Sequence, residues 1–436
     1  MSQVRPAPEQ GRFQYSVLPS FGALAAAVLL GAMAVAPCSA DPSLPLAEAE
    51  RLAIERDAVL QQLAVESAGM REQAIAEGQL MDPRLRVGAV NVPVNDFSFT
   101  AEDMTMVEVG VTQEFPAGRT RELASRRMTQ VANAREFEAS DRRRSVQREV
   151  RRVWIELAYL AAARELVSGQ QTWVDQMRAS ALARYASGEG KQLDVLQAGL
   201  DVAMLREQQL DLDRDETMQR AKLARWLGDE DAGRAGPFAI PPRATQKPLA
   251  ELEGDLQRHP SQVDFERRIE AAQTAVDLSR QASRPGWMLD VSYGFRGGEM
   301  DGQNRPDMLT AMVSVDLPLF RGDRQNREVA AARAEAQGLH EMHTDHQREM
   351  HAMLAEAWGV VQRTGELEHF YETDLLPLAD QSVQAALLAY RSNRAMVDEV
   401  VAARRAALDA KVKHLRLAAE RAQAQYDMDY LVGEVP

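Results

Sequence analysis

The 436-residue sequence contains a single cysteine, few aromatic residues (6%) and, beyond its first forty residues, no long hydrophobic run. Because the only cysteine is Cys38, no disulfide can form within one chain. The lack of a later hydrophobic run excludes a transmembrane helix from the rest of the sequence. Any insertion of that part into a membrane must therefore use strands.

The sequence also lacks the motifs of common enzymes. It has no Gly-rich phosphate loop before a helix, no CxxC pair, and no Ser, His and Asp in a motif context. We therefore expect no enzymatic activity and no cofactor. The 65 acidic residues outnumber the 51 basic ones and give a formal net charge of −14. This balance argues against a nucleic-acid partner, because phosphate binding needs clustered Lys and Arg.

The N-terminus has the pattern of a secretory signal peptide. Arg5 and Arg12 precede an apolar run at 21–36 that is too short to span a bilayer comfortably, and small residues follow it. We expect residues 1–40 to be a signal peptide, cleaved after Ala40. Two alternatives stay open, namely a retained membrane anchor and lipidation of Cys38 as in bacterial lipoproteins.

The remaining sequence contains an internal duplication. One set of identical residues, 205 positions apart, pairs Tyr185 with Tyr390, Ser187 with Ser392, Val195 with Val400, Ala198 with Ala403 and Gly228 with Gly433. A second set, 202 positions apart, pairs Pro83 with Pro285, Val111 with Val313 and Pro116 with Pro318. A duplication of this kind indicates one supersecondary unit that is used twice.

Each repeat is predicted to be a helix, two strands and a long helical hairpin, so the fold is mainly α with a small β part. The expected ranges of the first repeat (41–228) are a helix at 44–80, strands at about 84–94 and 104–115, and a hairpin over 119–228. After a linker at 229–248, those of the second repeat (249–436) are a helix at 249–283, strands at about 287–296 and 308–317, and a hairpin over 322–433. Helices of this length predict a coiled-coil or tubular body.

Apolar and polar residues alternate most clearly in the second strand pair. Segments of about ten alternating residues are typical of tilted strands that cross an outer membrane. The predicted lipid-facing residues are Trp287, Leu289, Val291, Tyr293, Phe295, Val313 and Val315. A half-buried hairpin of a soluble domain also alternates, and the first pair is less regular because it contains Arg84 and Arg86.

Four strands cannot close a barrel, and a sheet with open edges cannot span lipid. We therefore expect the chain to oligomerise. Two copies would supply eight strands around a filled interior, and three copies would supply twelve strands around a pore.

Paired motifs recur where the predicted helices and strands end. The first pair is Tyr185-x-x-Gly188-x-x-x-x-Leu193-Asp194-Val195-Leu196 with Tyr390-x-x-Asn393-x-x-x-x-Asp398-Glu399-Val400-Val401. The second pair is Trp226-Leu227-Gly228 with Leu431-Val432-Gly433. The third pair is Gln113-Glu114-Phe115-Pro116-Ala117-Gly118 with Asp316-Leu317-Pro318-Leu319-Phe320. In these motifs the chain resembles the TolC family of outer-membrane efflux proteins, over essentially all of the mature sequence. The resemblance implies a homotrimer with a twelve-strand barrel in the outer membrane of a Gram-negative bacterium, continued by a periplasmic helical tunnel.

The resemblance further implies an exit duct of a tripartite efflux system, which works with a periplasmic adaptor (membrane fusion) protein and an inner-membrane resistance–nodulation–division pump. The paired turns would lie at the tip of the tunnel, where the adaptor docks and the channel closes. The tip residues are Tyr185, Gly188, Asp194, Tyr390, Asn393, Asp398 and Glu399. Gly and Asn suit a left-handed turn. In a trimer the acidic residues would form rings that gate or select ions, although an acidic residue in the first turn of a helix is also favoured by the helix dipole.

One cluster is a candidate metal site. His343 and His346 share a helix face, and Met350 follows His346 by four residues, so a soft-metal site for copper or silver is geometrically feasible. A solvated helix face with packing methionines would give the same pattern. Segments 91–94, 104–106 and 113–118 resemble the heavy-metal branch of the family, which implies heavy-metal cations as cargo. The alternatives are a drug-efflux duct, a type I protein-secretion duct, and a periplasmic coiled-coil adaptor or scaffold.

Overall fold

The computed structural model describes residues 43–244, 247–300, 303–392 and 394–433. The expected signal peptide, Cys38 and Asn393 lie outside the described residues. The first half contains α1 (Leu46–Arg56), α2 (Ala58–Glu77), β1 (Arg84–Val90), β2 (Met106–Phe115), α3 (Thr120–Ala186), α4 (Gln192–Leu227) and α5 (Asp229–Arg234). The second half contains α6 (Leu249–Leu256), α7 (Pro260–Gln281), β3 (Trp287–Phe295), β4 (Glu299–Met300), β5 (Gln303–Asn304), β6 (Met308–Val315), α8 (Gln325–Phe370), a π-helical turn η1 (Tyr371–Leu375), α9 (Leu376–Arg391) and α10 (Val397–Val432).

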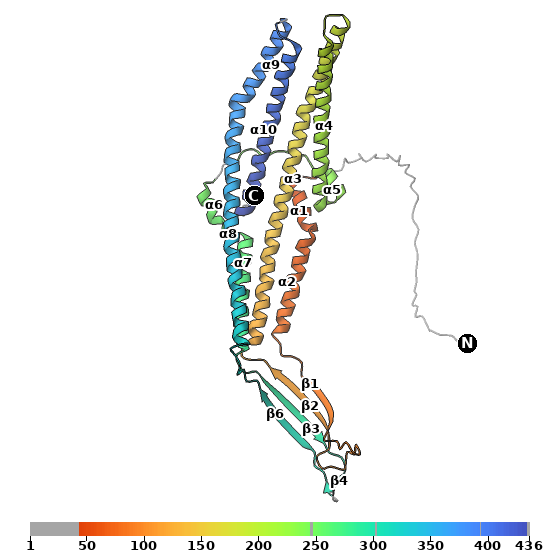
Figure 1. Ribbon diagram of the computed structural model, residues 1–436, viewed down its shortest axis with the longest axis vertical. Helices are drawn as coiled ribbons and strands as arrows, with labels where there is room; N and C mark the ends of the chain where they lie inside the picture. The colour runs from red at the N-terminus through yellow and green to blue at the C-terminus, as the bar shows by residue number, and fades with distance from the viewer. Residues whose placement is uncertain (1–42, 245–246, 301–302, 393, 434–436) are drawn as a thin grey trace, which may run out of the picture. The chain divides into compact units, whose positions relative to one another are not determined.

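The protein is mostly helical, with one small antiparallel sheet in the order β1-β2-β3-β6 (Figure 1). The central pair, β2 and β3, comes from different halves of the sequence, and Val111 lies opposite Val291 in its register. The two duplicated hairpins are therefore joined into a single sheet. β4 and β5 form a separate two-stranded ribbon.

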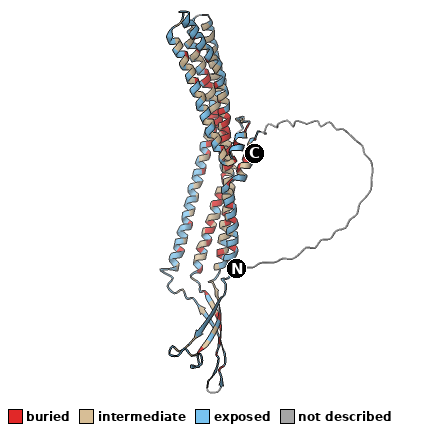
Figure 2. Ribbon diagram, turned by 90° about the vertical axis from the view of Figure 1, so that its right-hand side faces the viewer, coloured by how far each residue is buried: buried red, intermediate tan, exposed pale blue. Residues whose placement is uncertain are grey.

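Helix α3 is the element around which the other helices pack. It contacts α1, α2 and α4 from its own half, and α7 and α10 from the other half. Figure 2 shows the buried residues gathered along the middle of these helices. Among the described residues, no helix combines the length and the apolarity needed to cross a membrane.

Two apolar clusters hold the helices together. The first joins α1, α3, α4 and α5 around Trp154, and includes Val150, Leu157, Leu223 and Leu227. The second joins α6, α8 and α10 around Leu354, and includes Leu252, Leu256, Met428 and Leu431. Leu223 and Met428 are 205 positions apart, so the duplicated helices bury equivalent positions.

The two predicted helices that precede the strands are each broken in the structure. The helix expected at 44–80 is interrupted at Asp57, whose carboxylate accepts a hydrogen bond from Leu60 N (2.9 Å) and pairs with Arg142 (2.7 Å). The helix expected at 249–283 is interrupted before Pro260, where His259 Nδ1 accepts from Ser261 N (3.3 Å). In both cases a side-chain acceptor starts a new helix.

Three further elements differ from the predicted ranges. The helix expected to begin near 322 contains η1 directly before Pro377, because proline lacks the N–H that would bond four residues back. β1 ends at Val90, four residues early, since Asn91 has a left-handed backbone (φ +55°). The short helix α5 lies within the segment 229–248 that we expected to be a linker.

Ion pairs bridge the helices where the apolar core is thin. Arg151 on α3 pairs with Glu50 on α1 (2.6 Å). Glu368 on α8 pairs with Arg421 on α10 (3.0 Å), and the two side chains are only 3% and 8% exposed. Removing one partner of such a buried pair leaves the other charge without compensation.

We therefore expect Glu368→Gln to lower the free energy of unfolding by about 3 kcal/mol or more. The control is Glu366→Gln, since Glu366 pairs with Arg363 at 2.7 Å on the surface of the same helix. That change should cost less than about 1 kcal/mol. Urea unfolding followed by circular dichroism measures both values, and equal costs would contradict the buried-pair assignment.

Candidate functional site

The sheet has two chemically distinct faces. Residues that lie opposite each other in an antiparallel register share a face, so the pairing assigns every side chain. One face is apolar except for Gln113, and its members are Leu85, Val87, Ala89, Val107, Val109, Val111, Phe115, Trp287, Leu289, Val291, Tyr293, Phe295, Leu309, Ala311, Val313 and Val315. All seven residues predicted to face lipid lie on this face. Most of the face is exposed in the single chain.

The aromatic residues of this apolar face lie towards its two ends. At the end that leads into the helices, Phe115 and Trp287 stack with ring centroids 3.9 Å apart. At the opposite end lie Tyr293 and Phe295, next to the loops. Between these ends the face contains aliphatic side chains and Gln113.

The opposite face carries all the charged residues of the strands β1, β2, β3 and β6, together with Ser, Thr and Gly and several methionines. Arg86 donates to Glu108 (2.8 Å) and to Asp290 (3.1 Å), and Thr112 also donates to Asp290. Arg84 pairs with Glu114 at 3.1 Å. The arginines that made the first strand look irregular in sequence therefore belong to a regular alternation. Their partners lie on two other strands, β2 and β3, and the sequence could not reveal this pairing.

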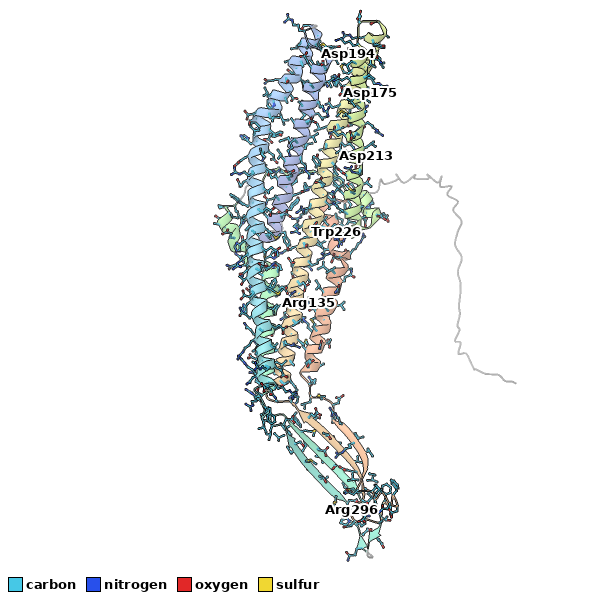
Figure 3. All side chains as sticks on the ribbon, viewed as in Figure 1. Arg135, Asp175, Asp194, Asp213, Trp226 and Arg296 are labelled. Atoms are coloured by element: carbon cyan, nitrogen blue, oxygen red, sulfur yellow. The ribbon has the colours of Figure 1, made fainter. Side chains whose placement is uncertain are left out.

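Two buried arginines fasten the loops at the far end of the sheet. The Arg305 guanidinium donates to five backbone carbonyls, those of Phe99, Gly297, Glu102, Asp103 and Thr105. Arg296, labelled in Figure 3, donates to the carbonyls of Pro306 (2.7 Å) and Asp103 (3.1 Å). Most of these acceptors lie about 200 residues from their donors, so sequence reasoning missed this contact.

The two helical turns lie at the end of the helices that is opposite the sheet (Figure 1). In the first turn, Gly188 has φ +78°, and Glu189 N donates to Arg184 O at 2.9 Å. In the second, Arg394 N donates to Ala389 O at 2.8 Å, which is the same bond 205 positions later. The duplicated motifs therefore build equivalent turns. Tyr185 is exposed, and Tyr390 is half-buried.

The acidic residues after the turns start the next helices. Asp194, labelled in Figure 3, accepts from Lys191 N (3.2 Å), and Glu399 accepts from Met396 N (3.1 Å). Each carboxylate thus satisfies a backbone donor at a helix N-terminus. Asp398, next to Glu399, is exposed. The structure gives Asp194 and Glu399 a local structural role, and it brings neither into contact with the other turn.

An exposed leucine stripe follows the first turn, and the sequence reading did not single it out. Leu193, Leu196 and Leu200 lie on one side of α4 at helical spacing, each about 60% exposed. A stripe of this kind at a helix end favours contact with another helix.

The predicted metal residues pack α8 against the start of α7. His343 Nε2 lies 2.7 Å from Gln262 Oε1, and its ring stacks on Phe265. His346 Nε2 lies 2.8 Å from Ser261 Oγ, and Met350 is buried. No cluster of three or more His, Cys, Asp or Glu side chains suited to a metal is found in the described part of the chain.

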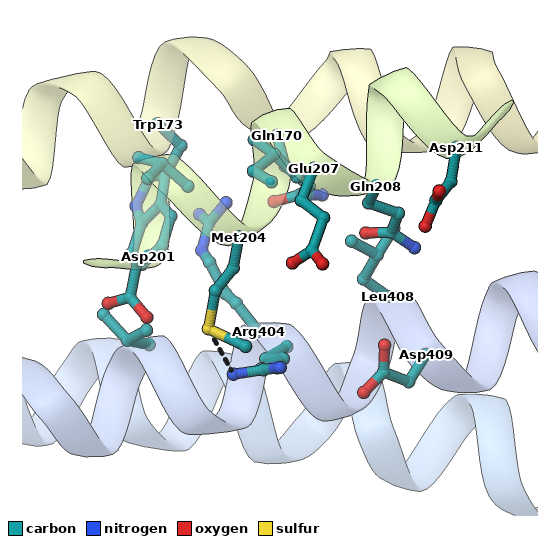
Figure 4. A pocket seen from close by; sticks show the side chains of 14 residues that line it. Gln170, Trp173, Asp201, Met204, Glu207, Gln208, Asp211, Arg404, Leu408 and Asp409 are labelled. Atoms are coloured by element: carbon teal, nitrogen blue, oxygen red, sulfur yellow. Dashed lines mark hydrogen bonds between the residues drawn. The ribbon is translucent and has the colours of Figure 1, made fainter. Parts of the chain in front are cut away.

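A cavity of about 390 Å³ separates the two hairpins, between α3 and α4 on one side and α10 on the other (Figure 4). The Arg404 guanidinium lies over the Trp173 ring, 4.4 Å from its centroid, and burial lowers the pKa of Arg404. Arg405 donates to Met204 Sδ at 3.6 Å. Burial raises the pKa of Asp201, against the opposing effect of Arg405. The cavity has mixed charge and no arrangement for catalysis.

No family model matches the sequence, and no curated protein is similar to it. Solved structures do match the fold. The outer-membrane protein VceC from Vibrio cholerae is 19% identical with a TM-score of 0.75, and the alignment covers 89% of this chain and 96% of VceC. A membrane protein from Pseudomonas aeruginosa is 18% identical with a TM-score of 0.76, over 89% of this chain and 93% of its own.

The CmeC outer-membrane channel from Campylobacter jejuni is 13% identical with a TM-score of 0.73, over 89% of this chain and 85% of CmeC. These proteins share the arrangement of helices and sheet along nearly their whole length. The chain therefore has the fold of outer-membrane channel proteins.

Proposed function

We propose that this chain is a TolC-family exit duct, a homotrimer in the outer membrane of a Gram-negative bacterium that conducts substrates passively and catalyses no reaction. The observation that carries the proposal is the sheet with one apolar exposed face and one polar face joined by ion pairs. A soluble sheet with one apolar face covers that face with helices or a second sheet. Here the helices pack against one another, and the apolar face stays open.

The apolar face has the properties of a membrane surface. β3 has nine residues, which lies within the range of about 9–11 residues that a tilted strand needs to cross a membrane. Trp287 and Tyr293, near the two ends of the strand, suit the two aromatic girdles of such a band. The face proposed to contact lipid carries no charged residue, and the charged residues of these strands lie on the opposite face.

The edges of the sheet require other copies of the chain. β1 and β6 each pair on one side only within the described residues. In lipid the unpaired N–H and C=O groups would each cost several kcal/mol. Pairing β6 of one copy with β1 of the next removes every edge. Three copies give twelve strands and an open pore, as a duct needs, whereas two copies give a filled interior.

The helices would then extend into the periplasm and present the turns to the rest of an efflux system. We assign the turns around Gly188 and Asn393 to the docking of a periplasmic adaptor protein, which connects the duct to a resistance–nodulation–division pump. The leucine stripe of α4 supports a helix-binding role for this end. We further propose that the two halves, 41–228 and 249–436, arose from one duplicated unit.

For the cargo we propose heavy-metal cations, on the resemblance of segments 91–94, 104–106 and 113–118 to that branch of the family. Drug efflux and type I protein secretion are the alternatives within the same family. A periplasmic coiled-coil scaffold is the alternative outside it, but the open apolar sheet disfavours that function. Export of metal, drug and protein substrates from a deletion strain complemented with this chain would decide among these cargoes.

The membrane face can be tested with two neighbouring residues. Val313 and Met312 lie next to each other on β6, are 61% and 53% exposed, and point to opposite faces. We expect Val313→Arg to cost about 2–4 kcal/mol of stability in lipid, because it places a charge in the apolar band. Met312→Arg should be tolerated on the water-filled side. Folding into lipid vesicles measures both, and equal costs would contradict the barrel.

The docking end can be tested at Gly188, whose missing side chain faces open space. We expect Gly188→Leu to abolish export while the trimer still forms and inserts, because leucine strains a left-handed backbone and adds bulk to the tip. Gly188→Asn is the matched control, since the duplicated turn has asparagine at that position. Trimer yield, cross-linking to the adaptor and export are measured in one strain. Full export by Gly188→Leu would exclude this turn as a docking surface.

The gate can be tested at the two carboxylates after the second turn. We expect Asp398→Asn together with Glu399→Gln to lower the cation selectivity of the channel in planar bilayers, because a ring of charges is removed from the lumen. Glutamine keeps an acceptor for Met396 N, so the helix start is preserved. An unchanged ratio of cation to anion permeability would place both residues outside the lumen.

A further inference from the structure

Three donor atoms from two helices converge on the Ser261 hydroxyl. Ser261 Oγ lies 2.8 Å from His259 Nδ1, 2.8 Å from His346 Nε2 and 3.5 Å from Met350 Sδ. His259 and Ser261 belong to the start of α7, whereas His346 and Met350 belong to α8. Two imidazole nitrogens and one thioether sulfur therefore surround a single point inside the protein.

Two of these donors are buried, and His259 Nδ1 also caps the N-terminus of α7. His259 and Met350 are 1% and 2% exposed. Ser261 N donates to His259 Nδ1 (3.3 Å), so the proton lies on Nε2 and the Nδ1 lone pair points towards Ser261.

A second layer of side chains positions the first. His259 Nε2 lies 3.7 Å from Asp141 Oδ1, and that carboxylate also accepts from the Tyr430 hydroxyl at 2.8 Å. Gln262 Nε2 lies 2.9 Å from Met350 Sδ, while its Oε1 contacts His343. A carboxylate that accepts from the distal nitrogen of a histidine is the usual outer partner of a metal-bound imidazole, and Asp141 lies just beyond hydrogen-bond distance of His259 Nε2.

We infer that His259, His346 and Met350 form a binding site for a soft monovalent cation, Cu(I) or Ag(I), which displaces the hydroxyl of Ser261 from the point where the three donors meet. Thioether and imidazole ligands select Cu(I) among the biological metals, and Ag(I) shares that preference. No redox step is involved, because the ion is bound in the oxidation state in which it arrives. A bound ion would link the N-terminus of α7 to α8.

This set differs from the one that spacing on a single helix suggests. His343 lies on the same face of α8 as His346, but its Nε2 is held by Gln262 and its ring by Phe265. The second imidazole of the proposed site therefore comes from His259, at the start of α7. The site lies among the helices of one chain, so it does not depend on the proposed trimer or on the cargo of the duct.

The test is Ag(I) binding to the purified full-length protein, by equilibrium dialysis in chloride-free buffer with metal analysis. We expect one tight equivalent per chain and a higher melting temperature with Ag(I), because a ligand that binds only the native state stabilises it. His346→Gln and Met350→Leu should each lower the affinity for this Ag(I) ion by more than roughly 10- to 100-fold, which is the loss expected when an outer partner of a metal ligand is changed. Ser261→Ala should retain it, since no donor is lost.

His351→Gln, at an exposed histidine of the same helix, and Met353→Leu are the matched controls, and both should bind as the unchanged protein does. Met350→Leu conserves volume, and circular dichroism checks that each variant is folded. Absence of a tight equivalent in the unchanged protein would overturn the site. So would equal losses in the controls, which would show adventitious binding to other histidines and methionines. Loss of binding in Ser261→Ala would also overturn it, because the hydroxyl would then be a ligand.

Discussion

A strand edge that leaves its backbone N–H and C=O groups unpaired cannot persist in lipid. The proposed assembly of several copies of the chain follows from this constraint. In the part of the chain that the structure describes, the sheet β1-β2-β3-β6 has an apolar face that no helix covers, and its outer strands pair on one side only. Each feature alone would be a liability in water, where exposed apolar strands aggregate. Together they fit one environment, a bilayer that covers the face and neighbouring copies that pair the edges.

The helices meet a different requirement. Long helices that pack side by side enclose only a narrow apolar core, so their stability must come from many separate contacts along their length. The structure supplies them as clusters on small stretches of α3 and as ion pairs between helices, for example Arg151 with Glu50 and Arg416 with Glu156 (both 2.6 Å). The ion pairs between helices explain how a chain with 27% charged residues still packs.

Periodicity made much of the fold predictable. The four long strands begin and end within two residues of the expected positions except at Val90, because alternation is a local property of the sequence. The helix break at Asp57 was missed because it depends on a side-chain hydrogen bond. The break at His259 was missed although Pro260 directly follows it. Contacts between distant segments, such as Arg305 with the loop after β1, leave no local pattern and could not be predicted.

The helices that follow the duplicated turns show how equivalent positions can diverge in chemistry while a shared hydrogen bond is kept. Asp194 and Glu399, 205 positions apart, both accept a backbone N–H at the start of a helix, and this shared role explains why an acid is needed there. One position earlier the repeats differ, because Leu193 corresponds to Asp398. The capping acid is structural in both copies, so the residue beside it is free to vary. One turn thereby presents an apolar side chain and the other a charge, and a symmetric trimer would alternate the two around its tip.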